Sequence, residues 1–148
     1  MAFVGFFGTA PDALRRLHTR ASFLCAPILH LSLSGTVALA YTTRDGTEPA
    51  PFPTTPITVA TDGRGCGEGE LLQLSRLYLR YGRRMRHRIL TPLCFAVCDS
   101  RKNLVLLGAT GGRRCYFEED EEGFWFSSVP TLLRAPCALT LALLKQKK

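Results

Sequence analysis

The sequence lacks the patterns that identify a metal site or a disulfide-rich scaffold. Its six cysteines are scattered through mostly apolar stretches, and no two show the two-residue spacing of a zinc knuckle. The three histidines do not cluster either. We therefore expect no metal and no cofactor. Cys94 and Cys98, four residues apart in one strand, are interpreted as buried thiols in a reducing cytoplasm rather than as part of a metal site or a disulfide.

Long uninterrupted apolar runs are also missing. The most apolar stretch, residues 21–40, follows three arginines in the order of a secretory signal peptide. It is interrupted by Pro27, His30 and Gly35, and a membrane span of about 20 apolar residues should not contain all three. We expect a cytoplasmic protein without a membrane partner, and a secreted protein is the alternative.

Acidic residues are in the minority, because 19 lysines and arginines face 12 aspartates and glutamates and give a net charge of +7. Much of the excess lies between Arg76 and Arg88, where five further arginine and histidine residues intervene. Apart from Tyr78 and Tyr81, no aromatic residue interleaves this run as a platform on which bases could stack. A charge run on a helix is usually a solvated face. Nucleic acid is therefore not the partner we expect, and a basic nucleic-acid-binding module is kept as an alternative.

What is present is typical of one globular domain. Hydrophobic residues make up 46% of the 148 positions and charged residues 21%, which is enough for a core. Apolar runs and helical leucine spacings predict the secondary structure. The expected strands cover residues 2–8, 28–33, 37–42, 57–61, 93–98, 103–108, 114–117 and 124–127; the expected helices cover 12–20, 70–81 and 130–134, with a further candidate at 139–147. A Gly-, Pro- and Thr-rich stretch, residues 45–56, predicts a site loop. The sum is an α+β domain whose last third is an antiparallel meander.

Six short segments have an order and a spacing that cover nearly the whole chain. They are residues 2–8 (AFVGFFG), 59–63 (VATDG), 77–82 (LYLRYG), 93–99 (LCFAVCD), 116–117 (YF) and 124–128 (FWFSS). This series resembles the class II glutamine amidotransferase domain of asparagine-synthetase-like proteins. The resemblance implies a four-layer αββα sandwich of two mostly antiparallel sheets, of the N-terminal-nucleophile hydrolase type, with a glutamine pocket at one end of the sheets.

The same resemblance implies that the catalytic nucleophile is missing. In active members a cysteine directly after the initiator methionine becomes the N-terminus, and its thiolate attacks the glutamine amide with its own amine as the base. That position is Ala2 here, and a methyl group cannot attack an amide. We therefore expect no catalytic residue, with Ala2 at the vestigial nucleophile position.

Other pocket residues of the family are altered too. The Asn-Gly pair that stabilises the oxyanion corresponds to Asp62 and Gly63, and a carboxylate would repel the oxyanion. The arginine that clamps the substrate carboxylate falls near Arg44. The aspartate segment after Gly63 has no counterpart, and an Arg-Asp pair of the family is Leu107-Gly108 here. Arg44, Asp62 and Gly63 are thus the expected remains of a pocket whose ligand would be L-glutamine.

The predicted function is that of a pseudoenzyme. Residues 1–148 are expected to form a single glutamine amidotransferase type 2-like domain, and the Ser-Gly-Gly-rich pyrophosphate loop of the family's synthetase domain does not occur in the sequence. ATP-dependent amide formation would then belong to another chain. By analogy with β-lactam synthetases and lasso-peptide cyclases, which have lost glutamine hydrolysis, the expected role is a structural or regulatory partner of a separately encoded amide ligase, for instance a peptide-modifying one.

Two further hypotheses stay open. Self-association could replace the ligase partner, because loss of a companion domain should expose an apolar patch. The chain would instead be a glutamine-hydrolysing ammonia donor if Ala2 replaces a native cysteine.

Overall fold

The computed structural model describes residues 2–8, 13–21, 29–34, 37–42, 57–62 and 68–145. Its helices are α1 (Ala13–Ala21) and α2 (Glu68–Tyr81), and its 3₁₀ segments are η1 (Gly82–Arg88) and η2 (Pro130–Leu132). Its strands are β1 (Phe3–Gly8), β2 (Leu29–Ser34), β3 (Val37–Thr42), β4 (Ile57–Thr61), β5 (Cys94–Asp99), β6 (Leu104–Ala109), β7 (Cys115–Glu119), β8 (Gly123–Ser127), β9 (Cys137–Leu139) and β10 (Leu141–Lys145).

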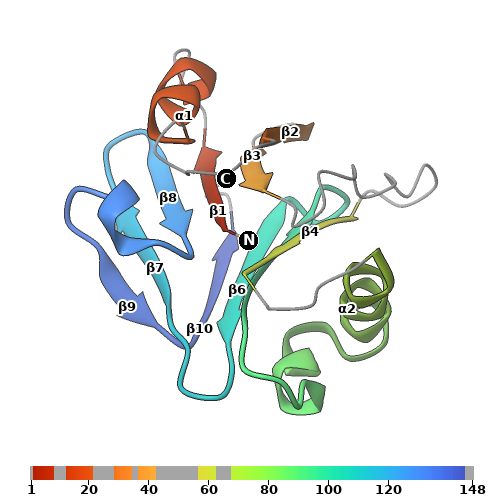
Figure 1. The fold of residues 1–148 in the computed structure, drawn as a ribbon. Helices are drawn as coiled ribbons and strands as arrows, with labels where there is room; N and C mark the ends of the chain where they lie inside the picture. The colour runs from red at the N-terminus through yellow and green to blue at the C-terminus, as the bar shows by residue number, and fades with distance from the viewer. Residues whose placement is uncertain are drawn as a thin grey trace.

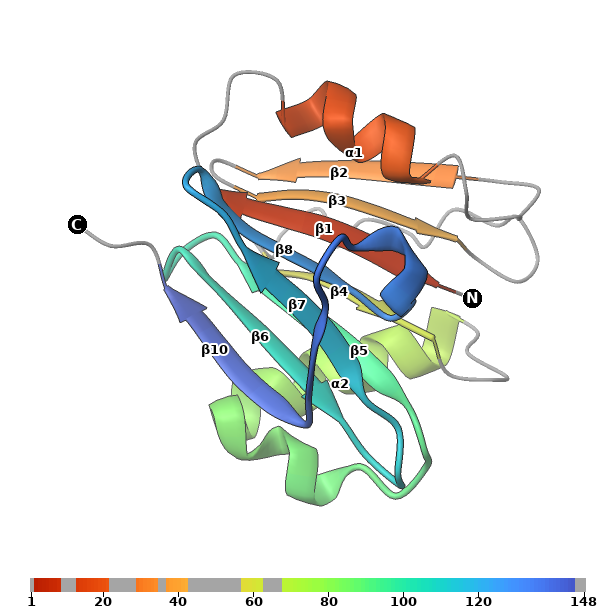
Figure 2. The same cartoon turned by 90° about the vertical axis from the view of Figure 1, so that its left-hand side faces the viewer.

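The strands form two antiparallel sheets, which we call sheet A and sheet B. Sheet A has the order β2-β3-β1-β8-β7-β9, and sheet B has the order β10-β6-β5-β4. The views in Figures 1 and 2 place α1 against the outer side of sheet A and α2 against the outer side of sheet B. The expected α+β class with antiparallel sheets is confirmed.

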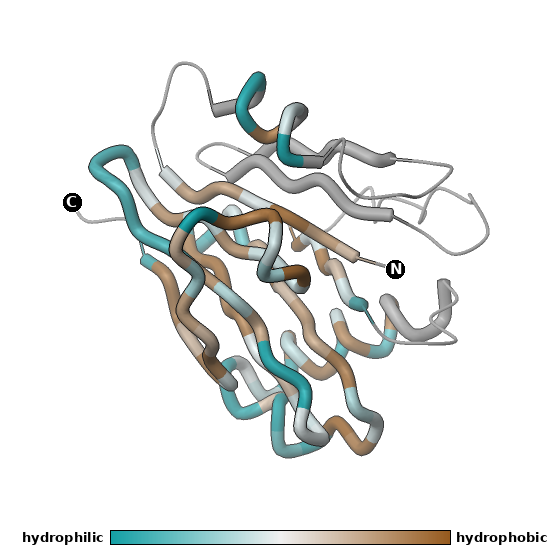
Figure 3. Tube along the Cα trace, turned by 60° about the vertical axis from the view of Figure 1, so that its left-hand side comes forward, coloured by the Kyte–Doolittle hydropathy of each residue, from teal (hydrophilic) through white to brown (hydrophobic). Residues whose placement is uncertain are grey.

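Three clusters of buried side chains explain why the layers hold together. The first lies between the sheets and joins Phe3 and Phe7 of β1 to strands of sheet B. The second packs α2 and η1 on sheet B, and the third packs α1 on sheet A. Hydrophobic stretches run along the strands of both sheets, as Figure 3 shows. The order through the molecule is therefore helix, sheet, sheet, helix.

β1 illustrates how the sequence encodes this layering. Phe3 and Phe7 point into the cluster between the sheets, whereas Val4 and Phe6 point to the opposite side, where they meet Leu17 of α1. Successive side chains of a strand alternate between faces. A strand that is covered on both faces must be apolar throughout, which is why this segment reads as a continuous apolar run.

The expected meander forms its four strands but not one sheet. β5 pairs with β6 in sheet B, whereas β7 pairs with β8 in sheet A. The chain changes sheet in the turn at Gly111 and Gly112, which have φ angles of 59° and 81°. A Cβ at Gly111 would also clash with Pro92. This left-handed turn favours glycine, and it redirects the chain instead of returning it beside β6.

The C-terminal helix prediction was wrong. Residues 139–147 were a helix candidate, but the described part forms the end of β9 and the strand β10, which pairs with β6 from Leu141↔Gly108 to Lys145↔Leu104. Burial of Leu144 between the sheets outweighs the helix propensity of this leucine-rich segment. The helix expected at 130–134 is only the 3₁₀ turn η2. The site loop expected at 45–56 lies outside the described residues.

Candidate functional site

Ala2, predicted to be a vestigial nucleophile position, lies at one end of sheet A. Ala2 directly precedes β1, whose start pairs with the end of β8 through Val4↔Ser127. The start of β7 pairs with the same residue through Tyr116↔Ser127. The starts of β1 and β7 therefore share this end of the sheet.

Asp62, predicted to correspond to an oxyanion-hole residue, lies at the same end of the sandwich, on sheet B. Asp62 directly follows β4, whose end pairs with the start of β5 through Thr61↔Phe95. Cys94 at the start of β5 is joined by a disulfide to Cys115 at the start of β7, with their Cα atoms 5.8 Å apart. Because this disulfide links the two sheets at the end where β1 begins, the fold brings Ala2 and Asp62 to a common end.

The carboxylate of Asp62 is engaged in holding the sheet. Its Oδ1 accepts a hydrogen bond from the backbone N–H of Cys94 at 2.6 Å, and its own N–H donates to the Cys94 carbonyl oxygen at 3.1 Å. Its Oδ2 lies 3.8 Å from the guanidinium of Arg113. A carboxylate oxygen accepts hydrogen bonds and cannot donate one. Asp62 therefore fixes the start of β5 and is chemically unsuited to stabilise an oxyanion.

Two serines anchor the start of β1. The backbone N–H of Phe3 donates to Ser128 Oγ at 3.0 Å, and the buried Ser127 Oγ donates to the Phe3 carbonyl oxygen at 2.8 Å. Ser127 Oγ also accepts from the backbone N–H of Val129 at 2.9 Å. Sequence reasoning treated these serines only as part of a family segment. Their long-range role depends on the β1–β8 pairing, which no local pattern reveals.

The remaining sequence-predicted pocket residues are placed as follows. Arg44 and Gly63 lie outside the described residues. Leu107 is buried in the cluster between the sheets. Gly108 lies opposite Phe95 in the β5–β6 pair, and a Cβ there would fall on the phenylalanine ring. Leu107-Gly108 therefore serves packing. Of the predicted pocket residues, Ala2 and Asp62 lie at the same end of the sandwich.

The prediction that Cys94 and Cys98 are both buried free thiols is only half right. Cys98 is a buried free cysteine, and burial raises its pKa to about 12, so the thiol stays protonated at neutral pH. Cys94, however, forms the disulfide with Cys115, 21 residues away and on the other sheet. A pairing between sheets cannot be read from spacing along one strand. Disulfides are rare in reducing compartments, and a cytoplasmic location remains a prediction.

A buried carboxylate lies at the opposite end of β5. Asp99 accepts hydrogen bonds from the hydroxyl of Tyr78 at 2.7 Å and from the guanidinium of Arg101 at 3.2 Å. Burial alone would raise the pKa of Asp99, but the hydrogen bonds from Arg101 and Tyr78 outweigh it and leave the pKa below its ordinary value. Burial, followed by the contact with Asp99, raises the pKa of Tyr78. This neutralised cluster fastens α2 to sheet B.

Metal-binding and membrane-spanning features can be judged for the described part of the chain. Within it, no three His, Cys, Asp or Glu side chains lie close enough together to hold a metal ion. No helix in the described ranges has the length and hydropathy to cross a membrane.

Comparison with known proteins adds no family assignment. No model of a protein family matches the chain, and no protein of curated function matches it at a significant level. The assignment to an α+β sandwich of two antiparallel sheets therefore rests on the structure itself.

Proposed function

We propose that this chain is a catalytically degenerate, glutamine amidotransferase-like domain of the N-terminal-nucleophile type. In this proposal it is a structural or regulatory partner of a separately encoded, asparagine-synthetase-like amide ligase that uses ATP. One observation supports it: two facing sheets are each covered by a helix, and Ala2, just before β1, lies at the same end of the sandwich as Asp62, just after β4. That is the arrangement the sequence resemblance implies.

The chemistry at this end argues against glutamine hydrolysis. Attack on an amide needs a nucleophile and a base, and removing the nucleophile from a hydrolase costs several orders of magnitude in rate. The Ala2 side chain offers neither group. The serine hydroxyls beside it are occupied by the Phe3 backbone, and the Asp62 carboxylate would oppose the negative charge of a tetrahedral intermediate. What this end retains is the scaffold.

A partner role is supported by two edge strands of the described sheets. β9 and β10 are edge strands in the described sheets, and Leu141 and Leu143 of β10 are 41% and 38% exposed. An edge strand with apolar side chains is a template for pairing with another chain. A ligase that covers this edge would bury these leucines, and a second copy of the chain is the alternative occupant.

The loss of hydrolysis is tested by measuring ammonia release from L-glutamine. We expect none from the native chain and none from an Ala2→Cys variant, because Asp62 still opposes the oxyanion. Ammonia release by Ala2→Cys would instead favour the alternative of a glutamine-hydrolysing domain in which Ala2 replaces a native cysteine. A calorimetric titration with L-glutamine on the same samples separates a pocket that still binds its ligand from a purely structural scaffold.

A further inference from the structure

Two helical groups of arginines in the described part of the chain differ in their ion pairing. On α1, Arg16 pairs with Asp120 and Glu122 of the β7–β8 hairpin, and Arg20 pairs with Glu118 at 2.6 Å. On α2 and η1 the situation differs. The exposed arginines there, which we call the α2–η1 arginine face, are Arg76, Arg80, Arg83, Arg84 and Arg88. None of them forms an ion pair with a residue of the described ranges.

The sequence explains this lack of counter-charges. Residues 71–98 contain six arginines and a histidine but no aspartate, glutamate or lysine. Asp99, the next acidic residue along the chain, is buried and held by Tyr78 and Arg101. Within residues 71–98, therefore, no acidic side chain offsets the positive charge of this surface.

The fold gathers these arginines instead of letting them spread. Gly82, with a φ of 58°, ends α2 and turns the chain into η1. Buried Met85 and a 2.8 Å hydrogen bond from Arg86 Nε to the Ala109 carbonyl oxygen fasten η1 to the body of the protein. The bend is therefore fixed by packing.

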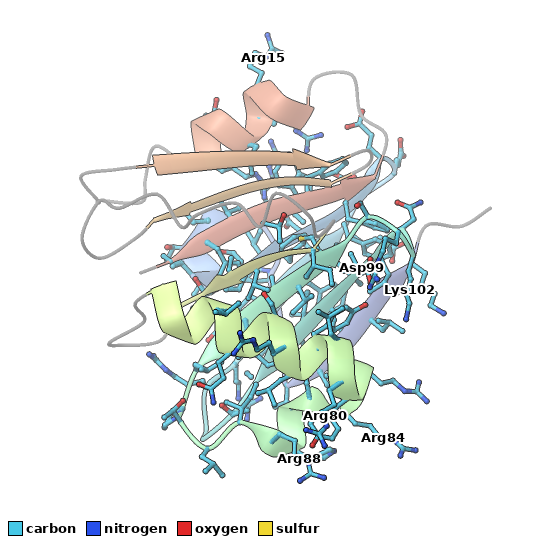
Figure 4. The ribbon with its side chains drawn as sticks, turned by 90° about the vertical axis from the view of Figure 1, so that its right-hand side faces the viewer. Arg15, Arg80, Arg84, Arg88, Asp99 and Lys102 are labelled. Atoms are coloured by element: carbon cyan, nitrogen blue, oxygen red, sulfur yellow. A yellow bond between two sulfur atoms is a disulfide. The ribbon has the colours of Figure 1, made fainter. Side chains whose placement is uncertain are left out.

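One tyrosine ring contacts two of these arginines. The guanidinium carbons of Arg80 and Arg88 lie 5.4 and 4.6 Å from the ring centroid of Tyr81. Figure 4 shows Arg80, Arg84 and Arg88 grouped where α2 meets η1, on the side of the molecule away from Arg15. Like charges within a Debye length of about 8 Å repel one another. A bound polyanion would therefore reduce the electrostatic repulsion among these arginines.

We propose that the α2–η1 arginine face binds the phosphate backbone of a single-stranded nucleic acid. The planar guanidinium group of arginine can donate two parallel hydrogen bonds to one phosphate, whereas lysine offers a point charge. Residues 71–98 contain no lysine. Arg76 and Arg80 are one helical turn apart, a step of about 6 Å along α2. The guanidinium planes on Tyr81 provide surfaces on which unpaired bases stack.

A membrane surface fits these observations less well. A helix that lies in a membrane buries a broad apolar face in the lipid, but the apolar side of α2, including Leu74 and Tyr78, is packed against sheet B. This inference does not depend on the amidotransferase-like role, because it uses a different surface from the Ala2 and Asp62 end.

The test uses the full chain and a fluorescently labelled, short single-stranded RNA. Binding is followed by anisotropy between about 50 and 200 mM salt, where phosphate contacts lose most of their affinity. One variant carries Arg80→Gln, Arg84→Gln and Arg88→Gln. Its matched control carries Arg15→Gln, Arg134→Gln and Lys145→Gln, exposed positions outside this face. Each variant loses three positive charges and so lowers the net charge from +7 to +4.

We expect the native chain to bind the RNA with a steep salt dependence. The face variant should bind at least tenfold more weakly, with a log–log salt slope smaller by about two to three. The control should keep most of the affinity, and thermal unfolding should show both variants folded. Equal losses in the two variants would reduce the effect to net charge and overturn the proposal. No RNA binding at low salt would also overturn the proposal. If the chain then bound phosphatidylserine vesicles, the arginine face would be a membrane-binding surface instead.

Discussion

Asp99 is a single residue whose buried, charged side chain is expected to matter for stability. Its carboxylate is 0% exposed and accepts hydrogen bonds from the buried hydroxyl of Tyr78 and from Arg101. In an Asp99→Asn variant the amide group would face these donors, and we expect the free energy of unfolding to fall by about 2 kcal/mol. Urea denaturation measures this value. Tyr78→Phe, which removes one donor and keeps the ring, should cost about 1 kcal/mol; an unaltered stability for Asp99→Asn would contradict the account.

The same carboxylate contributes to the pH dependence of stability, together with Glu118 and Asp120. Burial alone would raise the pKa of each, but hydrogen bonds from backbone N–H groups and arginine side chains outweigh it and leave all three pKa values lowered. A folded-state pKa below the unfolded value of about 4 means that the stabilisation is complete above that pH and is lost as the pH falls further. Urea denaturation between about pH 6 and pH 3 should show this fall, and Asp99→Asn should show a shallower one. Constant stability over this range would rule out the mechanism.

The residue-scale features of the candidate site were readable from the sequence only in part. That Ala2 cannot act as a nucleophile follows from its identity alone. The role of Asp62 could not be predicted, because its partners, the Cys94 backbone and Arg113, come from β5 and from the turn after β6. The serine anchors of β1 are likewise invisible, since they lie more than 120 residues away from Phe3 along the chain.

At the scale of elements, α1 is attached to sheet A by a cluster around Trp125. The guanidinium carbons of Arg16 and Arg20 lie 4.9 and 4.2 Å from the tryptophan ring centroid. Arg20 also pairs with Glu118, and both side chains are nearly buried, at 13% and 12% exposure. Three kinds of contact therefore hold α1 on sheet A: the Arg20–Glu118 ion pair, the stacking of arginines on Trp125, and the packing of Leu17.

Breaking this cluster should loosen α1 measurably. Arg20→Ala leaves a largely buried carboxylate without its ion-pair partner, and we expect a loss of about 3 kcal/mol in the free energy of unfolding. Arg15→Ala, an exposed change on the same helix, is the matched control and should cost less than a third as much. Chemical denaturation of both variants provides the comparison, and equal costs would show that the Trp125 cluster does not hold α1.

Elements with a clear period were predictable and those defined by distant partners were not. The leucine spacing of α2 and the apolar runs of β1 and β5 encode burial locally. β10 has leucines that suit a helix equally well, and its pairing with β6 decides the outcome. η1 forms because Gly82 adopts a positive φ and Met85 is buried in the core, and neither feature gives a periodic pattern in the sequence.

At the scale of the whole molecule, the Cys94–Cys115 disulfide ties the two sheets together at the Ala2 and Asp62 end. The two cysteines are 21 residues apart in the sequence. A cross-link that closes a loop of this size stabilises a fold by about 3 kcal/mol, because it restricts the unfolded chain. A Cys94→Ala/Cys115→Ala variant should lose that amount in urea denaturation under non-reducing conditions. Cys137→Ser, at an exposed free cysteine, should change little. A peptide map of the native chain without a linked Cys94–Cys115 pair would contradict the structure at this point.

The proposed partnership with an amide ligase is tested most directly by reconstitution. An asparagine-synthetase-like ligase encoded in the same genome is assayed for ATP-dependent amide formation, by pyrophosphate release, with and without this chain and with an amine as the nitrogen source. We expect the chain to bind the ligase and raise its rate, and L-glutamine to be unable to replace the amine. A ligase that neither binds the chain nor responds to it, or that becomes glutamine-dependent in its presence, would contradict the proposed function.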